Sequence, residues 1–153
     1  MDRRGFCITG LGLWAPFVTA KAETPAPATV RRRSYAPADG TYAQAAEVHA
    51  PQRLLFVSGQ VPADAEGAVP EDFRDQCRLA WRNLGAQLKA AGLGYEHLVK
   101  ATVYLARRED RDAAREVRQE VLGRLPHPPA LTVVVAGIYD SAWLLEIEAI
   151  AAA

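Results

Sequence analysis

Few side chains in this sequence have the chemistry of a nucleophile or a metal ligand, and they are spread along the chain. Cys77 is a potential nucleophile, but it lies on the apolar stripe of a predicted helix, and we interpret it as a buried core thiol. His49, His97 and His127 lie on loops or strand ends with no ligand spacing between them. We therefore expect no metal site.

Two groups of charged residues are close enough in the sequence to act together. Glu146 and Glu148 lie two residues apart in a predicted strand, so their carboxylates point to the same face of a sheet. From the residues alone, we interpret them as solvent-facing carboxylates at the rim of that sheet. Arg31, Arg32 and Arg33 form a run that could contact phosphate, although a solvated tail is the simpler interpretation.

The elements that must position these residues include two amphipathic helices. Over residues 71–91, apolar side chains recur every three or four residues, which predicts a helix with one buried face. Pro70 precedes this segment and Gly92 follows it, as is typical of helix ends. Residues 110–122 are a second predicted helix, with an arginine-rich outer face.

Five further segments have the alternating or β-branched character of strands. Residues 42–48 and 53–57 are joined by a short connection that predicts a β-hairpin, and residues 98–105 follow the first helix. Residues 131–136 and 143–150 close the chain. The order ββαβαββ predicts an α+β domain in which both helices cover one face of a mixed sheet. In so short a chain, we expect another subunit to cover the opposite face.

The composition is that of one soluble domain with a distinct N-terminal segment. The chain has 153 residues, with 18 lysines and arginines against 18 aspartates and glutamates, so charge gives no reason to expect nucleic-acid or membrane binding. Residues 1–22 combine a charged start, an apolar run and a small-residue exit, which predicts a cleaved export signal. Residues 23–38 are predicted to be a Pro-rich linker, and residues 39–153 the folded domain.

Arg3 and Arg4 give the signal the form of a twin-arginine leader. Cleavage after Ala22 would leave 15 basic and 17 acidic residues, a net charge of −2. The apolar run is too short to span a bilayer, so we expect no stable membrane anchor after cleavage. The expected location is periplasmic or extracellular, or cytoplasmic if the signal is not used, since a disordered extension or a misplaced start codon would have the same pattern.

Several short motifs occur together in the predicted domain. The most specific are residues 57–62, with the sequence Val-Ser-Gly-Gln-Val-Pro, and residues 146–151, with the sequence Glu-Ile-Glu-Ala-Ile-Ala. They are accompanied by residues 40–45, 83–93 and 99–105. In order and spacing, these motifs resemble the RidA (YjgF-type) reactive-intermediate deaminase family over about residues 38–152.

The resemblance implies a chorismate-mutase-like fold and a homotrimer whose sheets pack into a central barrel, with small-molecule clefts between subunits. It also implies hydrolysis of enamine or imine intermediates to 2-keto acids and ammonia, without a metal or cofactor. That chemistry requires a polar group that positions water and a cation that binds the substrate carboxylate. By resemblance, Glu146 positions the water, and the residues that line the cleft are Tyr42, Ser58, Gly59, Tyr104 and Thr132.

One part of the family pattern is missing. The family binds the substrate carboxylate with an arginine in a Pro-Ala-Arg segment, whereas residues 128–132 here are Pro-Pro-Ala-Leu-Thr. Ala130 takes the arginine position, or Leu131 if the alignment shifts by one residue, and neither side chain binds a carboxylate. Arg115 replaces an asparagine usual on the second helix, so it is either a relocated cation or an exposed arginine that serves solubility. Thr41 replaces a proline that usually precedes the tyrosine.

Three functions are compatible with these observations. The one we favour is a divergent deaminase in which Glu146 directs water at a substrate whose carboxylate is absent or bound differently. The second is a small-molecule-binding protein that keeps the trimeric cleft and has lost the chemistry. The third, RNA cleavage, is disfavoured by the acidic charge of the mature chain and by the lack of paired histidines.

Overall fold

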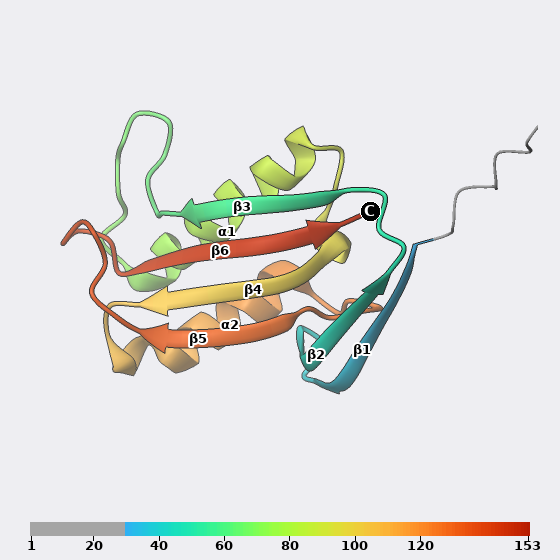
Figure 1. The fold of residues 1–153 in the computed structure, drawn as a ribbon. Coiled ribbons are helices and arrows are strands. Elements are labelled where there is room, and N and C mark those ends of the chain that lie inside the picture. Colours follow the sequence, from blue (N-terminus) through green and yellow to red (C-terminus); the bar gives the residue numbers. More distant parts are fainter. Residues whose placement is uncertain (1–29) are drawn as a thin grey trace, which may run out of the picture.

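The computed structural model describes residues 30–153, in which a six-stranded mixed sheet carries two helices on one face (Figure 1). In chain order, the strands are β1 (Arg31–Ala38), β2 (Tyr42–His49), β3 (Leu54–Gln60), β4 (Leu98–Leu105), β5 (Ala130–Val135) and β6 (Leu145–Ala152). The helices are α1 (Phe73–Ala90) and α2 (Arg111–Leu122), and single 3₁₀ turns precede β4 and α2 at Tyr95–His97 and Arg108–Asp110.

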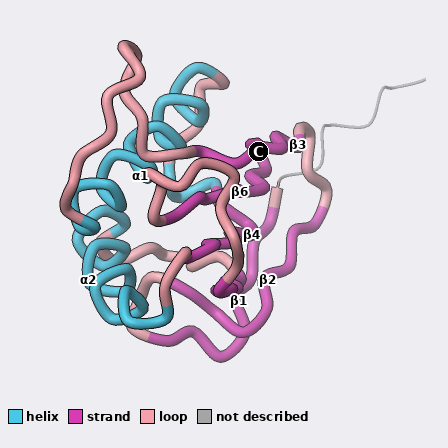
Figure 2. Tube along the Cα trace, turned by 90° about the vertical axis from the view of Figure 1, so that its left-hand side faces the viewer, coloured by secondary structure: helices cyan, strands magenta, loops and turns pink. Residues whose placement is uncertain are grey.

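The predicted α+β class is confirmed, with both helices in one layer and the strands in the other (Figure 2). Across the sheet the order is β1-β2-β5-β4-β6-β3, with β4 and β5 parallel and β6 antiparallel to both β4 and β3. No helix within residues 30–153 has the length and apolarity needed to cross a membrane. The predicted export signal at residues 1–22 and the first part of the predicted linker lie outside the described residues.

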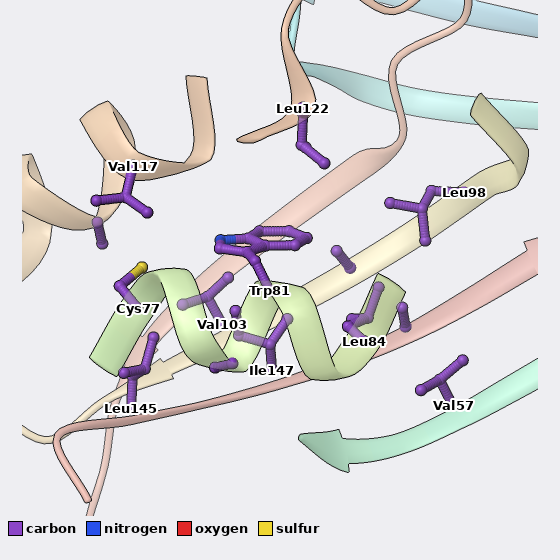
Figure 3. Packing of buried hydrophobic residues seen from close by; sticks show 14 of the residues in the cluster. Val57, Cys77, Trp81, Leu84, Leu98, Val103, Val117, Leu122, Leu145 and Ile147 are labelled. Atoms are coloured by element: carbon purple, nitrogen blue, oxygen red, sulfur yellow. The ribbon is translucent and has the colours of Figure 1, made fainter. Parts of the chain in front are cut away.

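The core fills the space between the helices and the sheet (Figure 3). Helix α1 begins after Asp72, whose carboxylate accepts hydrogen bonds from the first backbone N–H groups of the helix, as an N-cap does. Trp81 lies at the centre of the core, and its carbonyl accepts a hydrogen bond from the Tyr95 hydroxyl at 2.7 Å. Cys77 is fully buried beside it, and burial raises the pKa of its thiol to about 12. The interpretation of Cys77 as a core thiol is confirmed.

The predicted hairpin between residues 42–48 and 53–57 is wrong. β2 and β3 lie far apart in the sheet, because β3 forms one edge and pairs with β6. This pairing places Val57 beside Ala149 on the side that faces the helices, where both are buried. The strand that pairs with β3 is therefore the C-terminal strand β6, about 90 residues away in the sequence. No pattern near β3 in the sequence indicates a partner so far away.

Residues 31–38, predicted to belong to the linker, form β1 instead. This strand pairs with β2 along nearly its whole length, so the hairpin of the structure is β1–β2. The turn contains Asp39 and Gly40 with positive φ, a conformation that aspartate tolerates and glycine favours. Pro37 is accommodated because β1 is an edge strand. The chain therefore has one strand more at its start than the predicted order.

Candidate functional site

The face of the sheet that the helices leave uncovered, which we call the open face, carries a regular array of side chains. Registered neighbours on adjacent strands point to the same side of a sheet, so the pairing of β5, β4 and β6 defines three rows. In that strand order, the rows are Ala130, Lys100 and Ile150; Thr132, Thr102 and Glu148; and Val134, Tyr104 and Glu146. The prediction that Glu146 and Glu148 share a face is confirmed.

The Glu146 carboxylate lies against the irregular end of β3. The register between β3 and β6 shifts between Val57 and Gln60, which brings the Gly59 backbone beneath this side chain. A Cβ atom on Gly59 would lie 1.6 Å from Glu146 Oε1, far inside contact distance. Glycine is therefore the residue that lets Glu146 occupy this position.

Tyr104 and Glu148 form a hydrogen-bonded pair beside Glu146. The Tyr104 hydroxyl donates a hydrogen bond to Glu148 Oε1 at 3.1 Å. This hydrogen bond, together with burial and the negative charges of both glutamates, raises the pKa of the Tyr104 hydroxyl. Tyr104 therefore keeps its proton at neutral pH and acts as a hydrogen-bond donor. Among the residues that the structure describes, Glu146 has no side-chain hydrogen bond of its own, so its carboxylate is available to accept one from water.

A hollow of about 440 Å³ adjoins this cluster, within the size range of small-molecule sites. Its lining includes Phe56, Ser58, Lys100, Thr102, Glu148 and Ile150. A larger hollow of about 1070 Å³ lies between β1 and the loop after α2, but it contains none of the predicted site residues. We therefore place the candidate site on the open face.

Tyr42 lies apart from this cluster, in contact with a buried arginine. The Arg118 guanidinium lies 5.3 Å from the centre of the Tyr42 ring. It donates hydrogen bonds to Thr41 Oγ1 at 3.0 Å and to Asp39 Oδ2 at 3.1 Å. Burial lowers the pKa of Arg118, and the charge of Asp39 opposes that effect. Residues 110–122 were predicted to carry their arginines on the outer face of the helix, and Arg118 is an exception because its side chain reaches back to the β1–β2 turn.

Arg115 does point to solvent. Its side chain is 55% exposed, and its nearest acidic group is Asp112 Oδ1 at 4.0 Å. It projects from α2, in the helical layer behind the sheet, whereas the Glu146 cluster lies on the open face. β2, which carries Tyr42, lies three strand spacings from β6, which carries Glu146, about 14 Å across the sheet.

The predicted site residues therefore form two groups within one chain. Six of them lie on the open face or at its β3 edge, and these are Ser58, Gly59, Tyr104, Ala130, Thr132 and Glu146. Tyr42 and Arg115 lie elsewhere. Lys100 was missed as a site residue, although the alternation that places Tyr104 on the open face places Lys100 there too. Within residues 30–153, no group of three or more His, Cys, Asp or Glu side chains could hold a metal ion.

Known proteins are similar to this chain in both sequence and fold. Residues 33–153 match the family model described as endoribonuclease L-PSP. The chain is 36% identical over 115 residues to the 2-iminobutanoate/2-iminopropanoate deaminase of Mus musculus, covering 73% of this chain and 81% of that protein. It is also 36% identical over 114 residues to a RutC family protein of Pyrococcus horikoshii, covering 73% of this chain and 86% of that protein. The chain belongs to the RidA (YjgF-type) family.

A solved structure agrees with this assignment. Escherichia coli TdcF with bound serine superposes with a TM-score of 0.63 at 27% identity, covering 79% of this chain and 99% of that chain. This RidA-family chain thus has the predicted chorismate-mutase-like fold. The two most specific motifs, at residues 57–62 and 146–151, meet in the structure where Gly59 passes under Glu146.

Proposed function

We propose that this RidA-family protein hydrolyses an enamine or imine intermediate to a carbonyl compound and ammonia. The observation that carries the proposal is the position of Glu146, held over Gly59 and free to bind water, beside the Tyr104–Glu148 pair. The mouse relative supports this reaction class, because its name specifies the deamination of 2-imino acids.

In the proposed reaction, Glu146 accepts a proton from water while the water oxygen bonds to the imine carbon. Glu146 passes this proton to the nitrogen, and the proton of the new hydroxyl also moves to the nitrogen as the C–N bond breaks, so ammonia leaves and the carbonyl group forms. One water is consumed and one ammonia released for each imine. Tyr104, with its raised pKa, donates a hydrogen bond to Glu148 and keeps that second carboxylate oriented.

Ammonia and keto-acid release from enzymatically generated 2-aminoacrylate tests the proposal. We expect release by the wild-type protein and a fall of about 10²- to 10⁴-fold for Glu146→Gln, the range for loss of a general base. Glu66→Gln, in an exposed loop, is the matched control and should retain full activity. Full activity of Glu146→Gln would show that Glu146 does not direct the water.

The second candidate is a binding protein without catalysis. One observation favours it, which is that residues 128–132 contain no arginine to bind a substrate carboxylate. A wild-type protein that binds 2-oxo acids but releases no ammonia from 2-aminoacrylate would establish this function in place of the first.

We also propose a homotrimer with the ligand clefts between subunits. The arrangement of the chain supports this, because Tyr42 contacts Arg118 of the helical layer, whereas the Glu146 cluster lies on the open face, with Glu146 three strands away. Residues 1–22 are proposed to be an export signal. N-terminal sequencing of the protein purified from its producing cell should then begin after Ala22.

A further inference from the structure

Lys100 is the only lysine or arginine in the four described strands β3, β4, β5 and β6. Its register in β4, with Ala130 on one side and Ile150 on the other, places it on the open face. Its ammonium group reaches over β5 and donates a hydrogen bond to Thr132 Oγ1. The charged end of Lys100 therefore lies above the stretch of β5 that begins with Ala130.

Among the described residues, no carboxylate forms an ion pair with Lys100, although Glu148 lines the same hollow. Within residues 30–153, its side chain is in no ion pair, and its polar contact is the neutral hydroxyl of Thr132. An ammonium group in such surroundings attracts an anion more strongly than one already paired.

The surroundings of Lys100 match a small anion with an alkyl group. The hollow that Lys100 lines has hydroxyl groups on Ser58 and Thr102 and apolar walls formed by Phe56 and Ile150. The Glu148 carboxylate lines it too, and its Oε1 accepts the hydrogen bond from the Tyr104 hydroxyl. Hydroxyls and the ammonium group can bind carboxylate oxygens, and the apolar walls suit a short carbon chain.

Building on the proposed function, we propose that Lys100 binds the carboxylate of a short 2-imino or 2-oxo acid on the open face. The Thr132 row, above which the ammonium lies, is two residues from the Glu146 row, about 7 Å along the strands. Thr132 on β5 and Glu146 on β6 are also two strands apart, about 10 Å across the sheet, so the bound acid extends diagonally over β4 toward the Glu146 carboxylate. The methyl side chain of Ala130 leaves the start of β5 open to the ligand.

Equilibrium binding of 2-oxobutanoate and of its uncharged amide, 2-oxobutanamide, tests this assignment without requiring turnover. We expect the wild-type protein to prefer the acid. Lys100→Met should weaken binding of the acid at least tenfold and remove the preference, while Lys100→Arg should keep it. Lys89→Met, which removes an exposed lysine from the end of α1, is the matched control and should bind like the wild type.

Two results would overturn the assignment. They are a wild-type protein with no preference for the acid and a Lys100→Met variant that keeps the preference. If Arg115→Met loses the preference while Lys100→Met keeps it, Arg115 is the cation instead. If Lys100→Met does not fold, as judged by its melting curve, Lys100→Gln serves as the uncharged variant. Absence of ammonia release with an intact acid preference would reject the proposed reaction and leave the role of Lys100 standing.

Discussion

The absence of a side chain at Gly59 determines where the Glu146 carboxylate lies. A methyl group there would overlap Glu146 Oε1, and the flexible glutamate would move more easily than the strand. We therefore predict that Gly59→Ala keeps the fold and lowers ammonia release from 2-aminoacrylate at least tenfold. The measurement is the initial rate at saturating substrate, beside a thermal melt of the same sample.

Gly137→Ala is the matched control for this change. A Cβ atom on Gly137 would have no other heavy atom within 4 Å, and the backbone of this residue does not have positive φ. The variant should therefore keep the wild-type rate. Equal rates for Gly59→Ala and wild type would show that the position of Glu146 does not matter for the reaction.

The Cys77 thiol should be inert in the folded protein. Burial raises its pKa to about 12, so the reactive thiolate is nearly absent at pH 8. In a Cys7→Ser background, we predict that iodoacetamide labels Cys77 only after denaturation, as followed by mass spectrometry. Labelling of the native protein within minutes at pH 8 would contradict the buried position.

The same pKa shift makes stability depend on alkaline pH. The unfolded thiol has a pKa near 9.0, and the folded thiol holds its proton up to about pH 12. The contribution of Cys77 to stability is therefore complete below pH 9 and decreases as the pH rises toward 12. In chemical denaturation experiments, the free energy of unfolding of Cys77→Ala should therefore decrease less than that of the wild type between about pH 9 and pH 11.

The periodicity of the sequence predicted which face of a helix or strand a residue occupies, but not which distant residue it contacts. The spacing of Cys77 within its helix and of Glu146 and Glu148 within their strand was sufficient to place all three side chains. Arg118 was misjudged, although Ala114 and Val117 mark its side of α2 as buried. Its acceptors, Asp39 and Thr41, lie almost 80 residues earlier in the chain, and no local pattern indicates that contact.

Whole strands could likewise be located from the sequence, but their pairing partners could not. The sequence identified β4 with its observed bounds and both helices to within two residues, because each has its own periodicity. It paired β2 with β3 because they are consecutive, whereas in the structure β1 completes the hairpin and β6 pairs with β3. β1 was not predicted as a strand because its arginine-rich sequence has no apolar alternation. This edge strand is held by its backbone pairing with β2.

Arg118 connects α2 to the β1–β2 turn through its hydrogen bonds, and replacing this side chain should destabilise the fold. Its side chain is 7% exposed and that of Asp39 is 23% exposed, so removing the cation leaves a partly buried carboxylate unpaired. Burial alone would raise the pKa of Asp39, but hydrogen bonds from Thr41 and the charge of Arg118 hold it below its usual value. We predict that Arg118→Met lowers the free energy of unfolding by about 2–4 kcal/mol in urea titrations.

Arg78 provides the matched comparison, because it also connects two elements but does so at the surface. It bridges α1 and α2 through Glu120, and its side chain is 39% exposed. Arg78→Met should therefore lower the free energy of unfolding by clearly less than Arg118→Met does, because solvent screens an exposed ion pair. Equal losses for the two variants would mean that the burial of Arg118 adds nothing to the strength of its contacts.

The open face has large exposed apolar side chains at its β3 edge. Phe56 is 70% exposed and Leu54, two residues earlier on the same face of β3, is 54% exposed. Phe56 lies beside Ile150 of β6. Neighbouring apolar side chains of this size on an exposed sheet face are typical of association surfaces. The helices cannot cover them, because both helices lie on the opposite face (Figure 2).

If the open faces meet in a trimer, a charge at Phe56 should prevent assembly. Phe56→Glu would bring a carboxylate into each copy of the contact, where burial without a partner is costly. We predict the mass of three chains for the wild type and of one chain for Phe56→Glu, measured by light scattering coupled to size exclusion. Arg82→Glu places the same new carboxylate on the exposed side of α1 and should leave the trimer intact. A wild-type monomer, or a Phe56→Glu trimer, would show that the open face is not the assembly surface, and the cleft between subunits would have to be abandoned with it.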